Sequence, residues 1–182
     1  MPFYVEEKRR RGNDFNAETQ RRRECGATMT VEEMKQIIAR GETLSVEFKS
    51  DKNRLSDSEL TDALAAMANA QGGMLFEGVE DNGEITGLHK AHLDVEGIVP
   101  LIENRTTPGL TVSVERVDCG NSMSVAVVRV KKSKMLIATN DGKYLRRRIG
   151  GDGKPEVVAI KPADVQSWHS SLGIYDPSEM IF

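Results

Sequence analysis

The stretch AMANAQGGMLFEGVEDNG, residues 66–83, changes from a helical pattern to a strand pattern, and this change decides the fold. Its first residues end a helix that begins at a capping box formed by Ser56 and Glu59. The paired glycines at its centre end that helix and permit a sharp turn. Residues 74–80 then form an apolar strand, and the Asp-Asn-Gly turn after them predicts a returning strand over 84–88.

The residues outside this stretch continue the same mixture of helices and hairpins. We expect further helices over 31–40, 93–105 and 162–172, a strand over 44–49, and two more hairpins, 110–117 with 123–130 and 135–139 with 144–149. Hairpins give antiparallel strand pairs, and amphipathic helices bury their apolar faces against a sheet. The sequence therefore predicts an α+β fold in which helices pack on a mixed, largely antiparallel sheet of β-hairpins.

The composition indicates a single domain with polar ends. The chain has 182 residues, 38% of them hydrophobic, and a formal net charge of −3. No apolar run is long enough for a membrane span, and the two cysteines lie far apart, which is typical of a reduced cytoplasmic protein. The three histidines share no spacing that indicates a metal site. We expect residues 1–28 to form a flexible basic extension, 29–174 the folded domain and 175–182 a C-terminal tail.

The second half of the folded part is strongly basic. Residues 128–161 contain ten Lys or Arg against three Asp or Glu. On a strand, Tyr144, Arg146 and Arg148 share one face, where an aromatic ring beside two guanidinium groups can stack on a base and hold phosphates. A strand edge protected by charge is the alternative. We favour nucleic-acid binding, mainly to the phosphate backbone, with seven residues in the interface: Lys131, Lys132, Lys134, Lys143, Tyr144, Arg146 and Arg148.

Residues 41–49, GETLSVEFK, combine two carboxylates with a lysine. Strand alternation places Glu47 and Lys49 on one face, and Glu42 lies at the preceding corner, where the chain can turn its carboxylate towards them. Asp81 follows the next expected strand. Such a set consists either of surface ion pairs or of a hard-cation site, with a lysine that steadies a phosphate or an attacking water.

Four motifs, in this order, resemble the AlbA-type DNA-binding domain of the Schlafen family. They are the Glu-Phe-Lys strand of residues 41–49, the helix end and paired glycines of 66–73, the strand end of 78–81, and the basic strand after a Gly-Lys turn over 142–146. Glu80 departs from the more common aspartate of the family. The resemblance implies a Schlafen AlbA-like fold and a module that binds DNA or RNA, of the transcriptional-regulator type.

The resemblance also implies two alternatives. Some Schlafen proteins are endoribonucleases that use two glutamates and an aspartate around a divalent metal. The matching metal ligands are Glu42, Glu47 and Asp81, and Lys49 joins them as a catalytic residue. A Mg²⁺- or Mn²⁺-dependent endoribonuclease is therefore one alternative, whereas binding alone requires no cofactor. The other is a regulatory or dimerisation module of a larger regulator, whose basic face serves another protein. Eukaryotic Schlafen proteins have two related lobes across a basic groove, so we also expect that a homodimer of this chain could rebuild such a groove.

Overall fold

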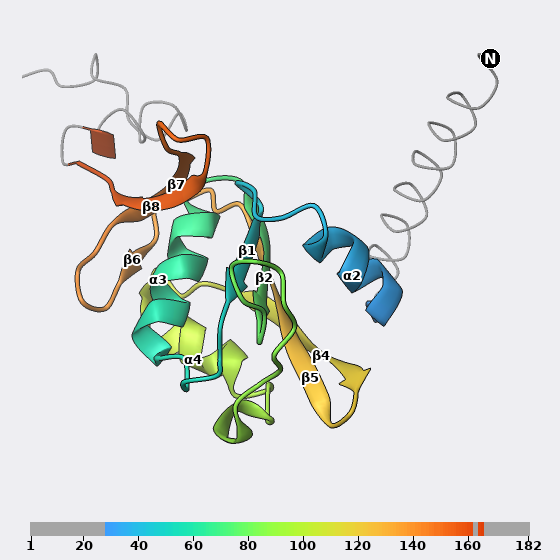
Figure 1. Ribbon diagram of the computed structural model, residues 1–182. Coiled ribbons are helices and arrows are strands. Elements are labelled where there is room, and N and C mark those ends of the chain that lie inside the picture. Colours follow the sequence, from blue (N-terminus) through green and yellow to red (C-terminus); the bar gives the residue numbers. More distant parts are fainter. Residues whose placement is uncertain (1–27, 162–163, 166–182) are drawn as a thin grey trace, which may run out of the picture.

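The computed structural model describes residues 28–161 and 164–165 (Figure 1). Its helices are α2 (Val31–Ile38), α3 (Asp57–Ala68), α4 (Ile98–Asn104) and a short 3-10 helix (Lys90–His92). Its strands are β1 (Val46–Lys49), β2 (Gly72–Glu77), β3 (Thr106–Thr107), β4 (Val112–Gly120), β5 (Met123–Lys131), β6 (Ala138–Thr139), β7 (Leu145–Ile149) and β8 (Pro155–Ala159). The expected N-terminal extension, the tail over 175–182 and almost all of the helix expected over 162–172 lie outside the described residues.

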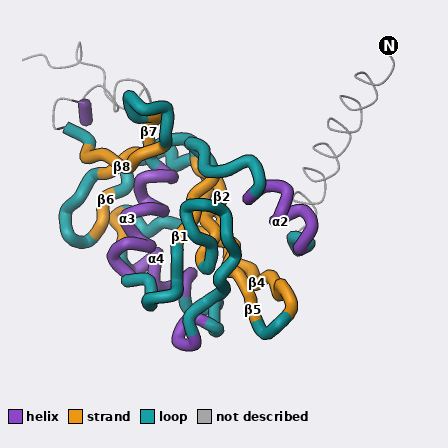
Figure 2. Tube along the Cα trace, viewed as in Figure 1, coloured by secondary structure: helices purple, strands orange, loops and turns teal. Residues whose placement is uncertain are grey.

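The main sheet has the strand order β1-β2-β5-β4. Strands β1 and β2 are parallel, whereas β2 with β5 and β5 with β4 are antiparallel. Two small sheets, β3 with β6 and β7 with β8, are also antiparallel. The expected α+β class with a mixed, largely antiparallel sheet is therefore confirmed, and Figure 2 shows how the loops link the three sheets.

The two faces of the main sheet are covered by different helices. Helices α3 and α4 bury the face that carries Leu75 and Val128. Helix α2 packs with the opposite face, where the rings of Phe48 and Phe76 meet edge to face with centroids 6.1 Å apart. In Figure 1, α2 and α3 accordingly lie on opposite sides of β1 and β2. Because side chains alternate along a strand, the face of β1 opposite Phe48 is the one turned towards α3.

Capping boxes fix the starts of both long helices, as the sequence predicts. The Thr30 hydroxyl accepts from the Glu33 N–H at the start of α2, and the Ser56 hydroxyl accepts from the Glu59 N–H at the start of α3. Helix α4 is shorter than the expected 93–105. Its Pro100 is tolerated because it lies in the first turn, where the missing N–H leaves no helical hydrogen bond unmade. None of the helices in the described part is long and apolar enough to cross a membrane.

The paired glycines lie inside β2 and not between the helix and the strand, which corrects the expected boundary. Helix α3 already ends at Ala68. A Cβ on Gly73 would lie 2.1 Å from the carbonyl oxygen of Ser45, and one on Gly72 would lie 2.6 Å from the carbonyl oxygen of Val130. Neighbouring backbones therefore approach so closely here that only glycine fits.

The expected hairpin of 135–139 with 144–149 is wrong in its pairing. Only one bridge, Ala138 with Tyr144, joins these segments. Strand β7 pairs instead with β8, which the sequence reading missed, through a turn in which the Gly150 N–H donates to the Lys154 carbonyl. The turn over 150–153 is rich in glycine, so it closes this hairpin more tightly than the longer path to β6. The expected return strand over 84–88 is likewise only a bridge between Val79 and Ile85.

Candidate functional site

A buried arginine on β7 is the centre of the first polar cluster. Arg147 is only 4% exposed. Its Nε donates to the Thr43 carbonyl at 2.9 Å and its Nη2 donates to the Val46 carbonyl at 3.0 Å. The guanidinium also forms ion pairs with Glu47 and, at 3.9 Å, with Glu42. Burial lowers the pKa of Arg147, while the charge of Glu42 opposes that shift.

The two glutamates of the 41–49 stretch meet at this arginine. Glu47 is 4% exposed, and its Oε1 lies 2.7 Å from the Nζ of Lys49, so both project from the same face of β1. Glu42 turns back towards the strand, and its Oε1 accepts a hydrogen bond from the Phe48 N–H at 2.9 Å. Arg147 and Lys49 thus pair with Glu47, and Arg147 together with a backbone N–H serves Glu42, so both carboxylates have partners from the chain itself.

Asp81 lies in the exposed turn after β2 and is not part of this cluster. Within residues 28–161 and 164–165, Glu42, Glu47 and Asp81 do not form a group whose ligand atoms all lie within 4.8 Å of one another. The catalytic and metal-binding roles of these carboxylates and of Lys49 stay predictions.

A second polar cluster, which sequence reasoning missed, joins the ends of β1 and β2. Asp51, Glu77 and His92 offer ligand atoms that all lie within 4.8 Å of one another. His92 comes from the 3-10 helix, and its Nδ1 lies 2.8 Å from Glu77 Oε1 and 3.0 Å from Asp51 Oδ1. Burial and the neighbouring charge of Asp51 raise the pKa of Glu77 to about 7, against the opposing effect of His92. A glutamate inside the apolar run of β2 was the available signal.

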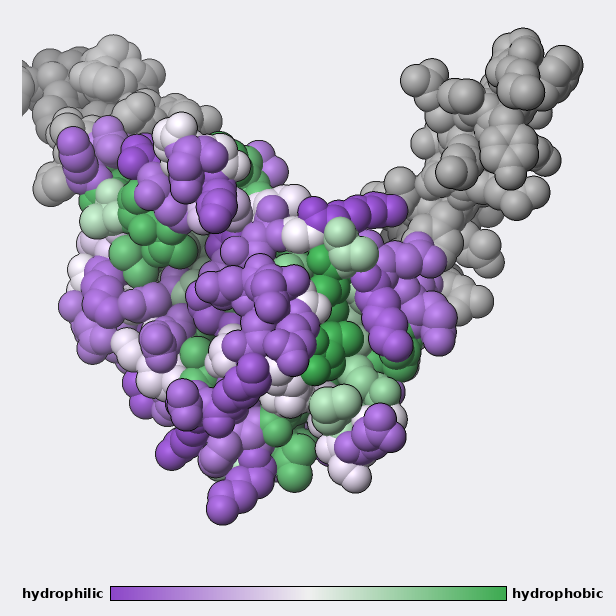
Figure 3. Space-filling view, viewed as in Figure 1, coloured by the Kyte–Doolittle hydropathy of each residue, from purple (hydrophilic) through white to green (hydrophobic). Residues whose placement is uncertain are grey.

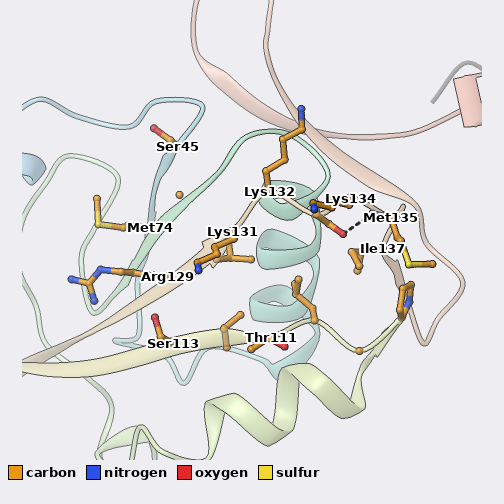
Figure 4. A pocket seen from close by; sticks show the side chains of 17 residues that line it. Ser45, Met74, Thr111, Ser113, Arg129, Lys131, Lys132, Lys134, Met135 and Ile137 are labelled. Carbon is orange, nitrogen blue, oxygen red and sulfur yellow. Dashed lines mark hydrogen bonds between the residues drawn. The ribbon is translucent and has the colours of Figure 1, made fainter. Parts of the chain in front are cut away.

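Three of the expected nucleic-acid-binding residues line one large cavity. Its volume is about 1060 Å³, and Lys131, Lys132 and Lys134, at the end of β5 and in the loop after it, form one side of its lining (Figure 4). All three side chains are exposed, and none forms an ion pair with a described residue. Arg129 also lines the cavity but is paired with Glu115. The lining contains no Asp or Glu among the described residues.

The other expected binding residues lie on or next to β7, and two of them form ion pairs with acidic side chains. The Nζ of Lys143 lies 2.7 Å from Asp62, and this hydrogen bond raises the pKa of Lys143. The Nε of Arg148 lies 2.8 Å from Glu156. Tyr144 is exposed and Arg146 is half-buried. Figure 3 shows hydrophilic side chains over most of the visible face, so a hydrophilic surface alone does not mark an interface.

A comparison with family models places the chain in a known class. A family model described as "Schlafen, AlbA_2" matches residues 42–155. The chain therefore belongs to the Schlafen AlbA_2 family, and this membership points to a nucleic-acid-related function.

A solved structure, the DIP2311 protein from Corynebacterium diphtheriae, is similar to the chain with a TM-score of 0.56 and 22% sequence identity. The similarity covers 81% of this chain but only 29% of that one, so it supports the fold alone. No curated protein matches the chain.

Proposed function

We propose that this domain binds DNA or RNA through the phosphate backbone, along the cavity wall formed by Lys131, Lys132 and Lys134. The observation that carries this proposal is the grouping, in the lining of one cavity of about 1060 Å³, of three exposed lysines that have no ion-pair partner among the described residues. The described lining contains no acid. A lysine ammonium is a mobile point charge, which suits contacts to phosphate oxygens. Such contacts position a protein on nucleic acid but carry no sequence information.

The shape and chemistry of the cavity support the binding of a nucleic-acid strand in it. Its remaining lining is mainly backbone and apolar side chains, including Leu110, Ile137 and the 57% exposed Met135. Apolar surface beside a row of cations suits a sugar or a base next to its phosphate. A role of the transcriptional-regulator type and a homodimer belong to the same proposal, because a symmetric second copy would supply a second lysine wall.

The test compares two sets of substitutions in the full chain. Binding to short labelled single-stranded DNA, single-stranded RNA and duplex DNA is followed by fluorescence anisotropy over a range of salt concentrations. The variant with Lys131, Lys132 and Lys134 all changed to Ala should bind all three probes more weakly, and its log–log salt slope should flatten by about 2–3 units. The matched control changes the paired bases, Lys143→Ala with Arg148→Ala, and should lower the slope by less than about one unit.

Wild-type affinity and slope in the triple-lysine variant would overturn the proposal. A larger loss in the Lys143 and Arg148 control would instead move the interface to β7, where the sequence reading put part of it.

One observation favours a second candidate, a divalent-metal-dependent endoribonuclease. Glu42 and Glu47 converge on one place, and Lys49 lies 2.7 Å from Glu47. In this arrangement the residues do not fit a Mg²⁺ or Mn²⁺ ion together with Asp81, because the Arg147 guanidinium already lies between the two glutamates. The same labelled RNA, incubated with either metal, tests this candidate. Cleavage by the wild type that is lost in Glu42→Gln would support it, and cleavage that continues at full rate would remove it.

A further inference from the structure

We propose that Asp51, Glu77 and His92 form a binding site for one divalent transition-metal ion. This site is separate from the carboxylates around Arg147 and from the lysine wall, and it does not depend on the nucleic-acid proposal. It joins the ends of the parallel strands β1 and β2 to the 3-10 helix that lies over them.

The spacing of the ligand atoms fits a single ion. His92 Nδ1 lies 2.8 Å from Glu77 Oε1 and 3.0 Å from both carboxylate oxygens of Asp51. Ligand atoms about 2.1 Å from a zinc ion are about 3.4 Å apart at the tetrahedral angle and about 3.0 Å apart at a right angle. The three side chains therefore need to spread by only a few tenths of an ångström to surround one ion.

The cluster leaves one of its two buried carboxylates, Glu77, short of hydrogen-bond donors. Asp51 is fully buried and Glu77 is 1% exposed. Glu77 Oε2 is buried and has no hydrogen-bond partner among the described residues. His92 faces three carboxylate oxygens with Nδ1, which carries at most one proton. Two buried negative charges side by side, one of them with an unsatisfied oxygen, are costly, and a divalent cation would compensate both.

The surroundings of the cluster hold its ligands in place and leave room for water. Asp51 accepts from the Leu55 N–H at 2.7 Å and from the His89 N–H at 2.6 Å, which fixes its carboxylate as outer hydrogen bonds do at metal sites. Glu77 and His92 also line a cavity of about 120 Å³. That volume accommodates several waters, each of which could complete the coordination sphere.

The donor set selects the type of metal. Two carboxylates with one imidazole suit Zn²⁺ or Mn²⁺, because an imidazole nitrogen is a good ligand for these ions and Mg²⁺ and Ca²⁺ prefer oxygen ligands. We therefore expect Zn²⁺ to bind more tightly than Mn²⁺, in line with the general order of affinities, and Mg²⁺ to bind weakest.

The contact of Arg54 with His92 predicts a shift of the imidazole proton on metal binding, which a purely structural cluster would not show. Its Nε donates to His92 Nε2 at 3.3 Å, which places the ring proton on Nδ1. A metal at Nδ1 requires the proton to move to Nε2, and the exposed Arg54 must then release the ring. Removing Arg54 should therefore leave metal affinity unchanged or increase it.

The experiment uses the full chain without a histidine tag, freed of metal with EDTA and then dialysed. Zn²⁺ binding is measured by calorimetry, and the imidazole tautomer of His92 by long-range proton–nitrogen NMR spectra. Wild type should bind one Zn²⁺ and move its ring proton from Nδ1 to Nε2. His92→Gln and Glu77→Gln should each weaken Zn²⁺ binding at least about tenfold. The matched controls, Glu84→Gln and Glu96→Gln, change exposed carboxylates outside the cluster and should bind as wild type does, whereas Arg54→Ala should bind at least as tightly as wild type.

Folding of each variant is checked by circular dichroism in EDTA. Added Zn²⁺ should raise the melting temperature of wild type and of the controls but not of the two ligand variants, because only a ligand that binds the native state stabilises it. Wild type that binds no Zn²⁺ would overturn the proposal. So would a folded His92→Gln variant with wild-type affinity, or a wild-type ring proton that stays on Nδ1 with Zn²⁺ present.

Discussion

Replacing Arg147 by Met should destabilise the domain more than any other single change of a basic residue in the described part. The substitution keeps much of the side-chain volume but removes the partner of the buried Glu47 carboxylate. It also removes the hydrogen bonds that the guanidinium donates to the carbonyls of Thr43, just before β1, and Val46, at its start. Loss of one partner of a buried ion pair typically costs about 3–5 kcal/mol, because an uncompensated charge is left behind.

Two effects set where in that range the value should fall. Each lost hydrogen bond from the guanidinium adds at most about 1 kcal/mol, because the Val46 carbonyl still accepts from the Thr43 N–H at 3.0 Å and the Thr43 carbonyl from the Val46 N–H at 3.4 Å. Lys49 offsets part of it, since its ammonium remains 2.7 Å from Glu47. We therefore expect Arg147→Met to lower the free energy of unfolding by about 3–5 kcal/mol, as measured by urea unfolding followed with far-ultraviolet circular dichroism.

The neighbouring arginine is the matched control. Arg148 is 55% exposed and pairs with the exposed Glu156, so Arg148→Met should cost only about 0–1 kcal/mol. The double variant Arg147→Met with Glu47→Leu should recover most of the lost stability, because it removes both charges together. Equal costs for the two arginines, or no recovery in the double variant, would refute the assignment of Arg147 as the buried counter-charge.

Two further substitutions test other parts of the fold by the same unfolding measurement. Asn69→Ala should lower the free energy of unfolding by about 2–4 kcal/mol, because this 1% exposed side chain makes three hydrogen bonds to backbone groups next to β6 and in β7. Its control, Asn82→Ala in an exposed turn, should lower it by less than about 1 kcal/mol. Gly73→Ala should prevent stable folding, because its Cβ would lie 2.1 Å from the Ser45 carbonyl oxygen, whereas Gly142→Ala meets no atom within 4 Å and should cost about 1–2 kcal/mol from its positive φ alone.

Local signals predicted much of the fold. Both capping boxes lie in the sequence within four residues, and they fix where α2 and α3 begin. The long hairpin of β4 and β5 was expected within three residues at each end, because alternation and a turn residue are close together in the chain. The partner of β7 was wrong, since that choice depends on how segments far apart in the sequence pack.

The candidate sites, too, were predicted where local alternation fixes a side chain and missed where distant segments must meet. Alternation correctly placed Glu47 and Lys49 on one face of β1, and it also put Arg147 on the opposite face from Arg146 and Arg148. The sequence therefore separated Arg147 from its two neighbours but did not predict its partners. The cluster of Asp51, Glu77 and His92 could not be predicted from the sequence, because the 3-10 helix brings its histidine to the other two residues only in the tertiary structure.

Ion pairs within the fold reduce the positive charge that residues 128–161 can offer to nucleic acid. Ten bases against three acids suggest a broad electropositive surface. In the structure, four of those bases form ion pairs with described acids: Arg129, Lys143, Arg147 and Arg148. A paired base that must give up its partner gains little from a phosphate, because one ion pair only replaces another. Ten bases less these four leave six, of which Lys131, Lys132 and Lys134 line the cavity, whereas Arg146, Lys154 and Lys161 do not. If binding uses the lysine wall, as proposed, its salt slope should be about −2 to −3, much smaller in magnitude than the value that ten bases would give.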